Sequence, residues 1–160
     1  MKNIVLCRID DRLIHGQVVT SWVKQTGGNK IIVVDDALTK DLFMQKILKA
    51  AAPPDVKVEV LNTLDATDVL KEEAVNGEKI IILVKIPQIL EKLIEGGVTI
   101  PKIILGGMGA KDGRKKFNRN VSASEEEVES MKKILGLGTE IYYQLVPTEA
   151  PTDVRKLLSE

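Results

Sequence analysis

The stretch Cys7-Arg8-Ile9-Asp10-Asp11-Arg12-Leu13-Ile14-His15-Gly16-Gln17 joins two different hydrophobic patterns and decides the fold prediction. The apolar run Ile4–Leu6 precedes it, and Val18–Val23 follows it with apolar residues at three- and four-residue spacing. A short apolar run followed by helical spacing predicts a strand, a loop and a helix in that order. The loop contains two arginines, two aspartates and the only histidine of the chain.

The alternation of strand and helix patterns continues along the sequence. The expected strands are Ile4–Leu6, Lys30–Val34, Val56–Leu61, Lys79–Lys85, Lys102–Leu105 and Glu140–Leu145. The expected helices are Gly16–Gln25, Lys40–Ala52, Leu64–Glu73, Pro87–Glu95 and Ser124–Leu135, with Pro151–Glu160 as a short closing helix or a frayed tail. Several strand runs are continuously apolar, which is typical of strands covered on both faces. The alternation predicts an α/β fold with a single domain over residues 1–160: an open, mainly parallel sheet of six to seven strands with helices on both faces.

Residues that cap or end helices agree with these boundaries. Thr39 is a candidate N-cap for the second helix, and Pro53-Pro54 stops that helix. Ser122 or Ser124 is the candidate N-cap of the last long helix. The first turn of that helix would carry Glu125–Glu127, where the helix dipole favours acidic side chains.

Composition and charge narrow the classes of function. The chain has 23 acidic and 23 basic residues, so no net charge attracts it to nucleic acid or to an anionic membrane. The single cysteine, Cys7, rules out an internal disulfide and a multi-cysteine metal site. No window approaches the roughly 20 apolar residues of a membrane span, and no signal peptide is recognisable. We therefore expect a cytoplasmic protein that needs no metal and no cofactor.

Four loops are expected to meet at the carboxyl edge of the sheet, where open parallel sheets bind their ligands. They are Arg8–His15, Asp35–Ala37, Lys85–Pro87 and Gly106–Gly109. Binding and transfer of a phosphoryl group require a nucleophile, cations for its oxygens and free amides. The first of these loops, with the helix start that follows it, offers all three.

His15 is the candidate nucleophile, which would attack through a ring nitrogen. Arg8 and Arg12 can bind phosphate oxygens with their planar, multi-donor guanidinium groups. Gly16 and Gln17 would present amides at a helix N-terminus, which is a natural seat for an anion. The loop therefore predicts a site for phosphoryl transfer.

Two aspartates complete the candidate catalytic group. A carboxylate of Asp10 or Asp11 that accepts from one imidazole nitrogen would fix the tautomer of His15 and leave the other nitrogen free to attack. Phosphoryl transfer depends mainly on positioning and charge compensation, so a metal is not obligatory. The competing interpretation is a solvated cluster of surface salt bridges, which would contribute little.

The other loops carry weaker signals. Gly106, Gly107 and Met108 indicate either a close approach of the backbone to phosphate or an ordinary turn after a strand. Asp36 either supports the active loop or forms a turn. The basic residues of Lys111–Arg119 form either a solvated face or a docking surface for an acidic partner.

Two other phosphate chemistries each lack a required residue. A cysteine phosphatase has an arginine six residues after its nucleophile, but Leu13 stands there, and Cys7 has the position of a buried small hydrophobic residue. A phospho-aspartate receiver domain has an acidic pair after its first strand, as Asp10-Asp11 would be. Its phosphorylated aspartate would end the third strand, where this chain has Asn62-Thr63.

The stretch Arg8–Val18 resembles the phosphorylation-site signature of enzyme IIB of the mannose/fructose/sorbose class of bacterial sugar phosphotransferase systems. The resemblance extends over nearly the whole chain, at Val33–Asp36, Pro53, Gly97-Val98, Gly106–Met108 and Gln144–Pro147. Asp35 stands where the family often has asparagine, so no detailed role is carried over to it.

This resemblance implies a phosphocarrier with the same open, mainly parallel sheet. A histidine of enzyme IIA would donate its phosphoryl group to Nδ1 of His15, and this chain would pass the group to a sugar carried through the membrane by IIC and IID. The protein would be cytoplasmic and held peripherally at the inner face of the membrane by IIC and IID. We expect His15 to be exposed in the free protein. The sugar and a possible homo-oligomer stay open, and the alternative function is a sugar-phosphate or nucleotide sensor that uses the same loops for binding alone.

Overall fold

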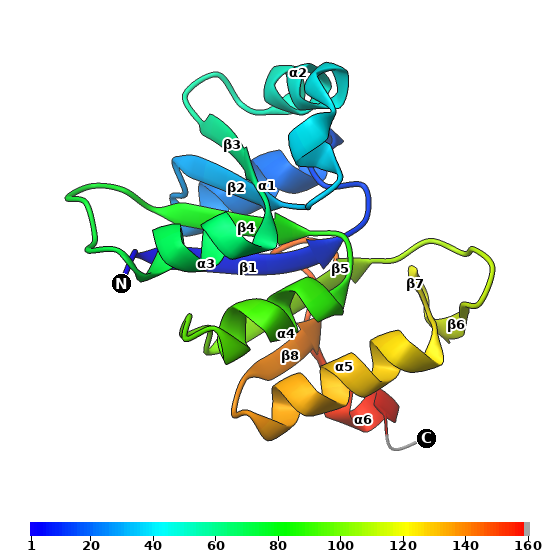
Figure 1. The fold of residues 1–160 in the computed structure, drawn as a ribbon. Coiled ribbons are helices and arrows are strands. Elements are labelled where there is room, and N and C mark those ends of the chain that lie inside the picture. Colours follow the sequence, from blue (N-terminus) through cyan, green and yellow to red (C-terminus); the bar gives the residue numbers. More distant parts are fainter. Residues whose placement is uncertain (159–160) are drawn as a thin grey trace.

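A seven-stranded sheet forms the centre of the computed structural model, which describes residues 1–158 (Figure 1). Its strands are β1 (Ile4–Asp10), β2 (Lys30–Val34), β3 (Lys57–Leu61), β4 (Ile80–Val84), β5 (Lys102–Gly107), β8 (Glu140–Tyr143) and β9 (Thr152–Asp153). They lie in the order β3-β2-β4-β1-β5-β8-β9, and all neighbours are parallel except β8 and β9. The prediction of an α/β fold with an open, mainly parallel sheet is confirmed.

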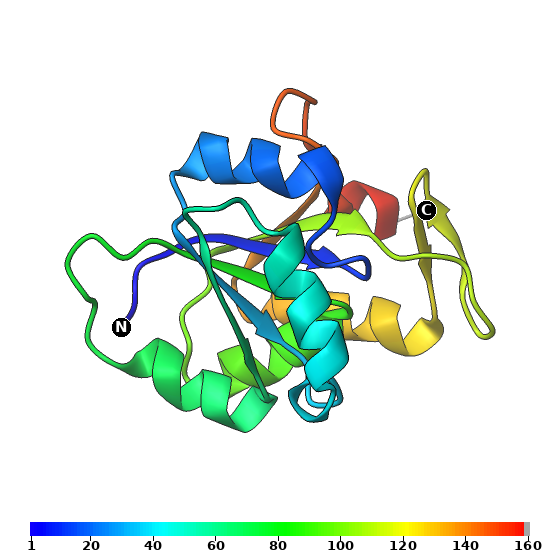
Figure 2. The same ribbon diagram turned by 90° about the horizontal axis from the view of Figure 1, so that it is seen from above.

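Helices cover both faces of the sheet, as predicted. The helices are α1 (Gly16–Thr26), α2 (Leu42–Ala51), α3 (Thr63–Lys71), α4 (Pro87–Glu95), α5 (Glu125–Gly136) and α6 (Val154–Leu158), with a short 3₁₀ helix η1 (Leu38–Lys40) before α2. In Figure 2, α1 lies on one side of the sheet, and α3, α4 and α5 lie on the other. No helix of residues 1–158 is long and apolar enough to cross a membrane.

The continuous apolar runs divide between two cores. Alternate side chains of a strand point to opposite faces, so Ile31 and Val33 pack in the core beneath α1 and α2. Ile32 and Val34 pack in the other core, which α3, α4, α5 and α6 cover. Burial on both faces explains why β2 and β4 lack the hydrophobic-polar alternation of a half-exposed strand.

The start of α2 and the identity of its N-cap differ from the sequence prediction. Asp41, and not Thr39, is the N-cap of α2, because its side chain accepts from the Met44 amide at 3.1 Å. Residues 38–40 form η1, so the α-helix starts two residues later than expected. Ser124 caps α5 in a reciprocal capping box with Glu127, which settles the choice between the two serines.

A two-stranded antiparallel hairpin, β6 (Lys115–Asn118) and β7 (Val121–Ala123), was not predicted. Its first strand is polar and carries no apolar run that would mark it as a strand. Strand β1 is also longer than expected, because the charged Arg8 and Asp10 are buried in it and paired with each other. The hairpin projects from the body beside the carboxyl end of β5 (Figure 1).

Candidate active site

The site loop lies where β1 and β5 end side by side. Asp10, the last residue of β1, stands opposite Gly107 at the end of β5. After β1 the chain enters α1 on one face, and after β5 it runs through the hairpin to α5 on the other face. Neighbouring connections that leave on opposite faces open a crevice at the carboxyl edge of a parallel sheet.

Asp10 is the centre of the charged group. Its buried carboxylate accepts hydrogen bonds from Arg12 through the amide and Nε at Oδ1, both at 3.1 Å, and through Nη2 at Oδ2, at 3.2 Å. Arg8 Nη2 donates to the same Oδ2 at 3.3 Å. A carboxylate buried away from water needs such compensation, so the three residues form one unit and not the solvated cluster that was the competing interpretation.

Arg8 has a different place from the expected phosphate clamp. Its side chain is 1% exposed, and Nη1 and Nη2 donate to the carbonyl oxygens of Gln144 and Leu145 at 2.9 and 3.0 Å. Its guanidinium also lies 5.4 Å from the ring centre of Trp22. Burial lowers the pKa of Arg8, and Asp10 opposes that effect. Nη1 and Nη2 of Arg8 thus bond to the protein framework and to Asp10, whereas its buried Nε has no hydrogen-bond partner among residues 1–158.

The two glycines at the end of β5 make room for this unit. A Cβ at Gly106 would overlap the Arg8 guanidinium. A Cβ at Gly107 would lie 3.2 Å from Arg12 Nη2 and 3.4 Å from Asp10 Oδ1. Met108 is buried, and its amide and carbonyl bond to Asn120 and Ser122, so it joins β5 to the hairpin. The two glycines therefore allow the side chains of Arg8, Asp10 and Arg12 to approach the backbone of β5 closely, and Met108 packs in the core.

His15 stands at the N-cap position of α1, with its side chain 24% exposed. Its Nδ1 lies 3.1 Å from the Leu13 carbonyl oxygen, and its Nε2 lies 4.0 Å from Asp10 Oδ2. Because a carbonyl oxygen only accepts, Nδ1 carries the proton in this arrangement. Nε2 is buried and has no hydrogen-bond partner. The expectation of an exposed histidine is thus met only in part, since the ring lies against β1.

The surface around His15 offers donors to an anion. The Arg12 side chain is 49% exposed even though it also pairs with Asp10. Gly16 and Gln17, in the first turn of α1, are exposed. The amides of a first helical turn have no partner within the helix. Beside Arg12, a cavity of about 500 Å³ extends toward the hairpin, where Lys116 and Arg119 line it.

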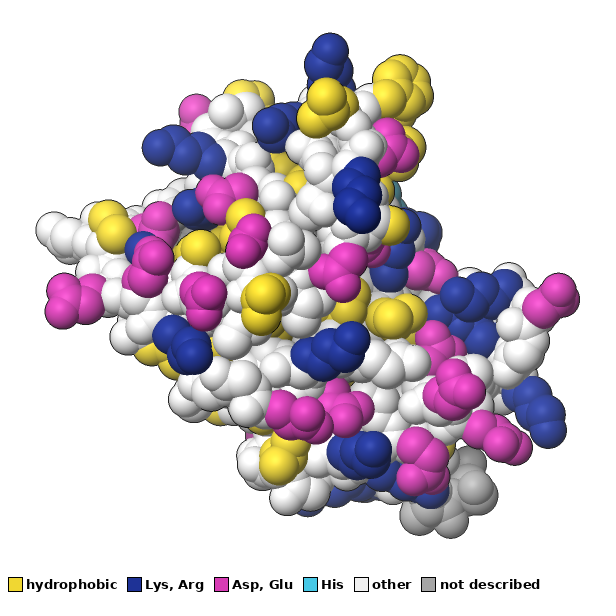
Figure 3. All heavy atoms as spheres, in the orientation of Figure 1, with side chains coloured by type: hydrophobic (Ala, Val, Ile, Leu, Met, Phe, Trp, Pro, Cys, Tyr) yellow, Lys and Arg dark blue, Asp and Glu magenta, His cyan; other side chains and the backbone are white. Residues whose placement is uncertain are grey.

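Asp11 connects this loop to the hairpin side. Its Oδ2 accepts from the Gly109 amide at 2.7 Å and from Arg114 Nη1 at 3.3 Å. The Arg114 side chain is only 2% exposed, although Lys115 and Lys116 beside it are exposed. Basic side chains gather around the hairpin at the right of Figure 3. The basic stretch Lys111–Arg119 therefore divides into surface cations and one buried arginine, which the sequence pattern did not single out.

Asp35 and Asp36 lie on another part of the carboxyl edge, because β4 separates β2 from β1. Asp35 accepts from the Leu38 amide at 3.0 Å and lies 3.9 Å from Lys85 Nζ. Asp36 accepts from the Thr63 amide at 2.7 Å. The hydrogen bond of Asp36 thus ties β2 to the start of α3, and not to the His15 loop.

Cys7 is buried within β1, as predicted, and burial raises the pKa of its thiol far above the ordinary range. A thiol that stays protonated is a poor nucleophile, which agrees with the rejection of cysteine chemistry. Among residues 1–158, no three His, Cys, Asp or Glu side chains are grouped to hold a metal ion.

Residues 4–160 match the family model described as "PTS system sorbose subfamily IIB component". The chain is 33% identical over 157 residues to the sorbose-specific EIIB component of Lacticaseibacillus casei, covering 98% of this chain and 96% of that protein. It is 37% identical over 157 residues to the mannose-specific EIIAB component of Escherichia coli K12. That match covers 98% of this chain and 49% of the relative, so the chain spans about half the length of the mannose-specific relatives.

Solved structures agree with this relationship. The IIBSor domain of the sorbose permease from Klebsiella pneumoniae superposes with a TM-score of 0.93 at 29% identity, covering 98% of this chain and 96% of that one. The manxB structure from Thermoanaerobacter tengcongensis gives 0.91 at 34% identity, covering 100% and 97%. The chain therefore belongs to the sorbose subfamily of IIB components of the sugar phosphotransferase system.

Proposed function

We propose that this chain is a phosphocarrier. It accepts a phosphoryl group from a phosphohistidine of enzyme IIA onto His15 and transfers the group to a sugar during uptake through the membrane components IIC and IID. The observation that carries this proposal is the placement of one imidazole against the buried Asp10, beside the half-exposed Arg12 and the open first turn of α1. Family membership supports the general class of function.

Nδ1 of His15 is the proposed nucleophile. Nε2 is buried on the Asp10 side, which disfavours it as the nitrogen that meets an incoming phosphorus atom. Attack requires that the proton leave Nδ1 and that Nε2 be protonated instead. Nε2–H then faces the Asp10 carboxylate, and a small rotation of the ring would close their 4.0 Å separation to hydrogen-bond distance and move Nδ1 away from the Leu13 oxygen.

The transfer then proceeds with a balanced exchange of bonds. The lone pair of His15 Nδ1 forms the new N–P bond while the N–P bond of the donor histidine breaks, and the donor nitrogen keeps that electron pair. In the second half, a sugar hydroxyl oxygen forms an O–P bond, its proton leaves to solvent or a base, and Nδ1 recovers its electron pair. Arg12 and the amides of Gly16 and Gln17 offset the charge on the phosphoryl oxygens.

Arg8, Asp10 and the two glycines have supporting parts in this mechanism. Asp10 stabilises the protonated Nε2 edge of the ring, and Arg8 fixes Asp10 from the framework side. Gly106 and Gly107 allow the side chains of Arg8 and Arg12 to approach β5. We further propose that the protein works in the cytoplasm at the inner face of the membrane, held there by IIC and IID.

Labelling with phosphorylated enzyme IIA tests this function. The parent protein is expected to take up one phosphoryl group per chain in an acid-labile, base-stable form, and His15→Ala is expected to take up none. Because His15 is the only histidine, phosphohistidine cannot form elsewhere in that variant. Uptake by His15→Ala at normal stoichiometry would overturn the proposal.

A second candidate, a sugar-phosphate or nucleotide sensor, draws support from the cavity beside Arg12 with its two further cations. A sensor would bind such a ligand stably, and His15→Ala would leave that binding unchanged. A carrier would lose phosphoryl transfer in the same variant. Titration calorimetry with sugar phosphates and nucleotides, run beside the labelling experiment, separates the two.

A further inference from the structure

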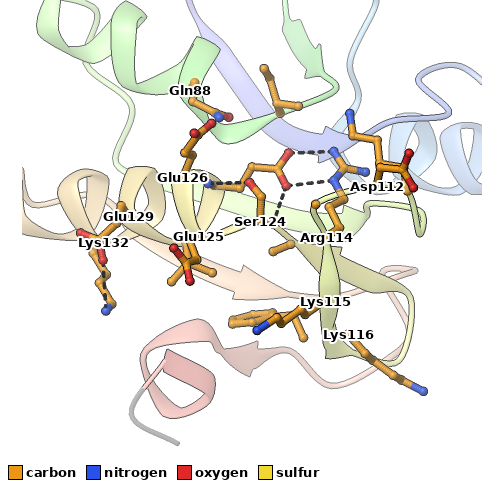
Figure 4. Close-up of a pocket in the computed structure, with 17 residues that line it drawn as sticks. Gln88, Asp112, Arg114, Lys115, Lys116, Ser124, Glu125, Glu126, Glu129 and Lys132 are labelled. Carbon is orange, nitrogen blue, oxygen red and sulfur yellow. Dashed lines mark hydrogen bonds and ion pairs between the residues drawn. The ribbon is translucent and has the colours of Figure 1, made fainter.

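An ion-pair network joins the His15 loop to the hairpin and to α5. Arg114 lies at its centre, between Glu127 in the first turn of α5 and Asp11 in the site loop. Figure 4 shows the Arg114 guanidinium directed at a carboxylate of α5, beside Ser124. A cavity of about 890 Å³ lies between the hairpin and α5 on this side of the molecule.

The contacts of Arg114 are divided between two separate partners. Nε and Nη2 donate to the two oxygens of Glu127 at 2.9 and 2.8 Å, in the paired geometry that a guanidinium allows. Nη1 donates to Asp11 Oδ2 at 3.3 Å and to the Gly109 carbonyl at 2.8 Å. Glu127 thus fixes the orientation of the guanidinium, which presents its remaining donor to the site loop.

Asp11 is held by its backbone as well as by its side chain. Its amide donates to the Gly107 carbonyl at 3.0 Å, and its carboxylate accepts from Gly109 and Arg114. The next residue is Arg12, whose amide and guanidinium both bond to Asp10. A shift of Asp11 would therefore carry Arg12 with it and change the distance between Asp10 and the ring of His15.

The burial of the Arg114 and Glu127 side chains distinguishes their pair from a surface salt bridge. Arg114 and Glu127 side chains are 2% and 5% exposed, whereas exposed pairs contribute little to structure. The hydrogen bonds to Glu127 raise the pKa of Arg114, so the central charge persists at all physiological pH values. The sequence gives no sign of this pairing, since a hairpin separates the two residues.

We propose that Arg114 is a positioning residue for the phosphoryl-transfer site, which acts through Asp11 and is itself oriented by Glu127. The inference rests on the proposed function of His15 and extends it to the hairpin. Loss of Arg114 leaves the Asp11 carboxylate with the Gly109 amide as its remaining hydrogen-bond partner, loosens the loop and lets Arg12 and His15 depart from the geometry that transfer requires. Small displacements of reacting groups slow catalysis strongly.

A double-mutant cycle tests whether Arg114 acts through Asp11. The variants are Arg114→Met, Asp11→Ala and their combination, and the rate measured is single-turnover transfer from phosphorylated enzyme IIA. Each single variant is expected to be about ten- to a hundredfold slower. Because the two residues form one connection, the double variant should be no slower than the slower single variant. Multiplied losses would overturn the proposal.

Arg155→Met is the matched control variant. Arg155 also makes a paired contact with a carboxylate, that of Asp153, but on β9 and α6 outside the loop network. Its transfer rate is expected to equal that of the parent. Asp11→Ala provides the second test if Arg114→Met fails to fold, because it frees the loop without leaving Glu127 unpaired.

The ¹H–¹⁵N NMR spectrum of the imidazole gives a readout that loss of stability alone would not move. His15 is the only histidine, so its ring nitrogens give one unambiguous set of signals. Arg114→Met and Asp11→Ala are expected to change the tautomer ratio of this ring, read from its ¹⁵N chemical shifts, in the folded protein, and Arg155→Met is not. A ring with the parent's tautomer ratio in both loop variants would contradict the inference. This NMR test is valid even if His15 takes up no phosphoryl group, so failure of the proposed function would be recognised separately.

Discussion

Two strands of the sheet end in a pair of aspartates, and the two pairs have different parts in the structure. After β1, Asp10 bonds to two arginines and faces His15, while Asp11 bonds to Arg114. After β2, Asp35 and Asp36 accept backbone amides of the following turn and of α3. The same dipeptide at the same edge thus lies beside the His15 ring in one place and caps local structure in the other. The difference lies in the three arginines and the histidine around the first pair, whereas the second pair has a lysine, Lys85, at 3.9 Å from Asp35.

The largest expected effect is the contrast between Asp10→Asn and Asp35→Asn in the free energy of unfolding that each variant loses. Removing the charge of Asp10 leaves the buried Arg8 without its carboxylate, which costs about 3–5 kcal/mol in the free energy of unfolding. Asp35→Asn keeps a side-chain oxygen that can accept from the Leu38 amide and should cost about 1 kcal/mol. Chemical denaturation of both variants measures the contrast, and equal losses would show that the two pairs have equivalent roles.

Gly106→Ala tests the surroundings of the first aspartate pair from β5, because Gly106 lies against Arg8, the partner of Asp10. A methyl group there overlaps the Arg8 guanidinium, so Arg8 or β5 must shift, at a cost of about 1–3 kcal/mol. Gly136→Ala is the control, since a Cβ there meets nothing within 4 Å and alanine favours the helical conformation by roughly 0.5–1 kcal/mol. A Gly106→Ala protein as stable as the parent would mean that Arg8 is not fixed as described.

Stability in acid is expected to depend on the Asp11–Arg114–Glu127 network. Burial raises the pKa of Glu127, but hydrogen bonds from Arg114 and Ser124 outweigh this and hold the pKa below the ordinary value of 4.5. Because the folded pKa is the lower one, ionised Glu127 contributes its full stability above about pH 4.5, and this is lost as the pH falls through the folded pKa.

The measurement for this pH dependence is the free energy of unfolding between pH 3 and pH 6. The parent should lose stability below about pH 4.5 more steeply than Glu127→Gln, because the variant lacks the titrating carboxylate. Glu127→Gln should be the less stable protein at pH 6. Parallel curves for the two proteins would contradict the assigned role of Glu127.

The smallest expected effect is the chemical reactivity of the thiol of Cys7, the residue before Arg8. Its buried thiol, with a raised pKa, should not react with iodoacetamide in the folded protein and should react once the chain is unfolded. Mass spectrometry counts the label under both conditions. Rapid labelling of the folded protein would show that β1 opens far more readily than its burial implies.

The parts of the fold that depend on local pattern could be predicted from the sequence. The bounds of β2 and α4 coincide with the predicted ones, because an apolar run between polar residues and a proline at a helix start are local signals. The position of the His15 loop between β1 and α1 follows in the same way. The hairpin β6–β7 was missed because its polar first strand has no such signal.

The contacts that fix the site depend on residues distant in sequence. Arg8 was expected to bind phosphate, but it bonds to carbonyls of Gln144 and Leu145, more than 130 residues away. Likewise, Arg114 is buried because the fold brings Glu127 and Asp11 to opposite sides of it. Residue type and spacing identified a charged site around His15, whereas the fold decides which arginine supports the site and which one remains at the surface.

The most direct test of the central claim is ¹⁵N NMR of the single histidine after phosphorylation by enzyme IIA. We expect one ³¹P-coupled ring nitrogen, assigned to Nδ1 of His15, and no coupled nitrogen in the His15→Ala protein. Coupling at Nε2, or a fully phosphorylated protein with no coupled ring nitrogen, would contradict the central claim.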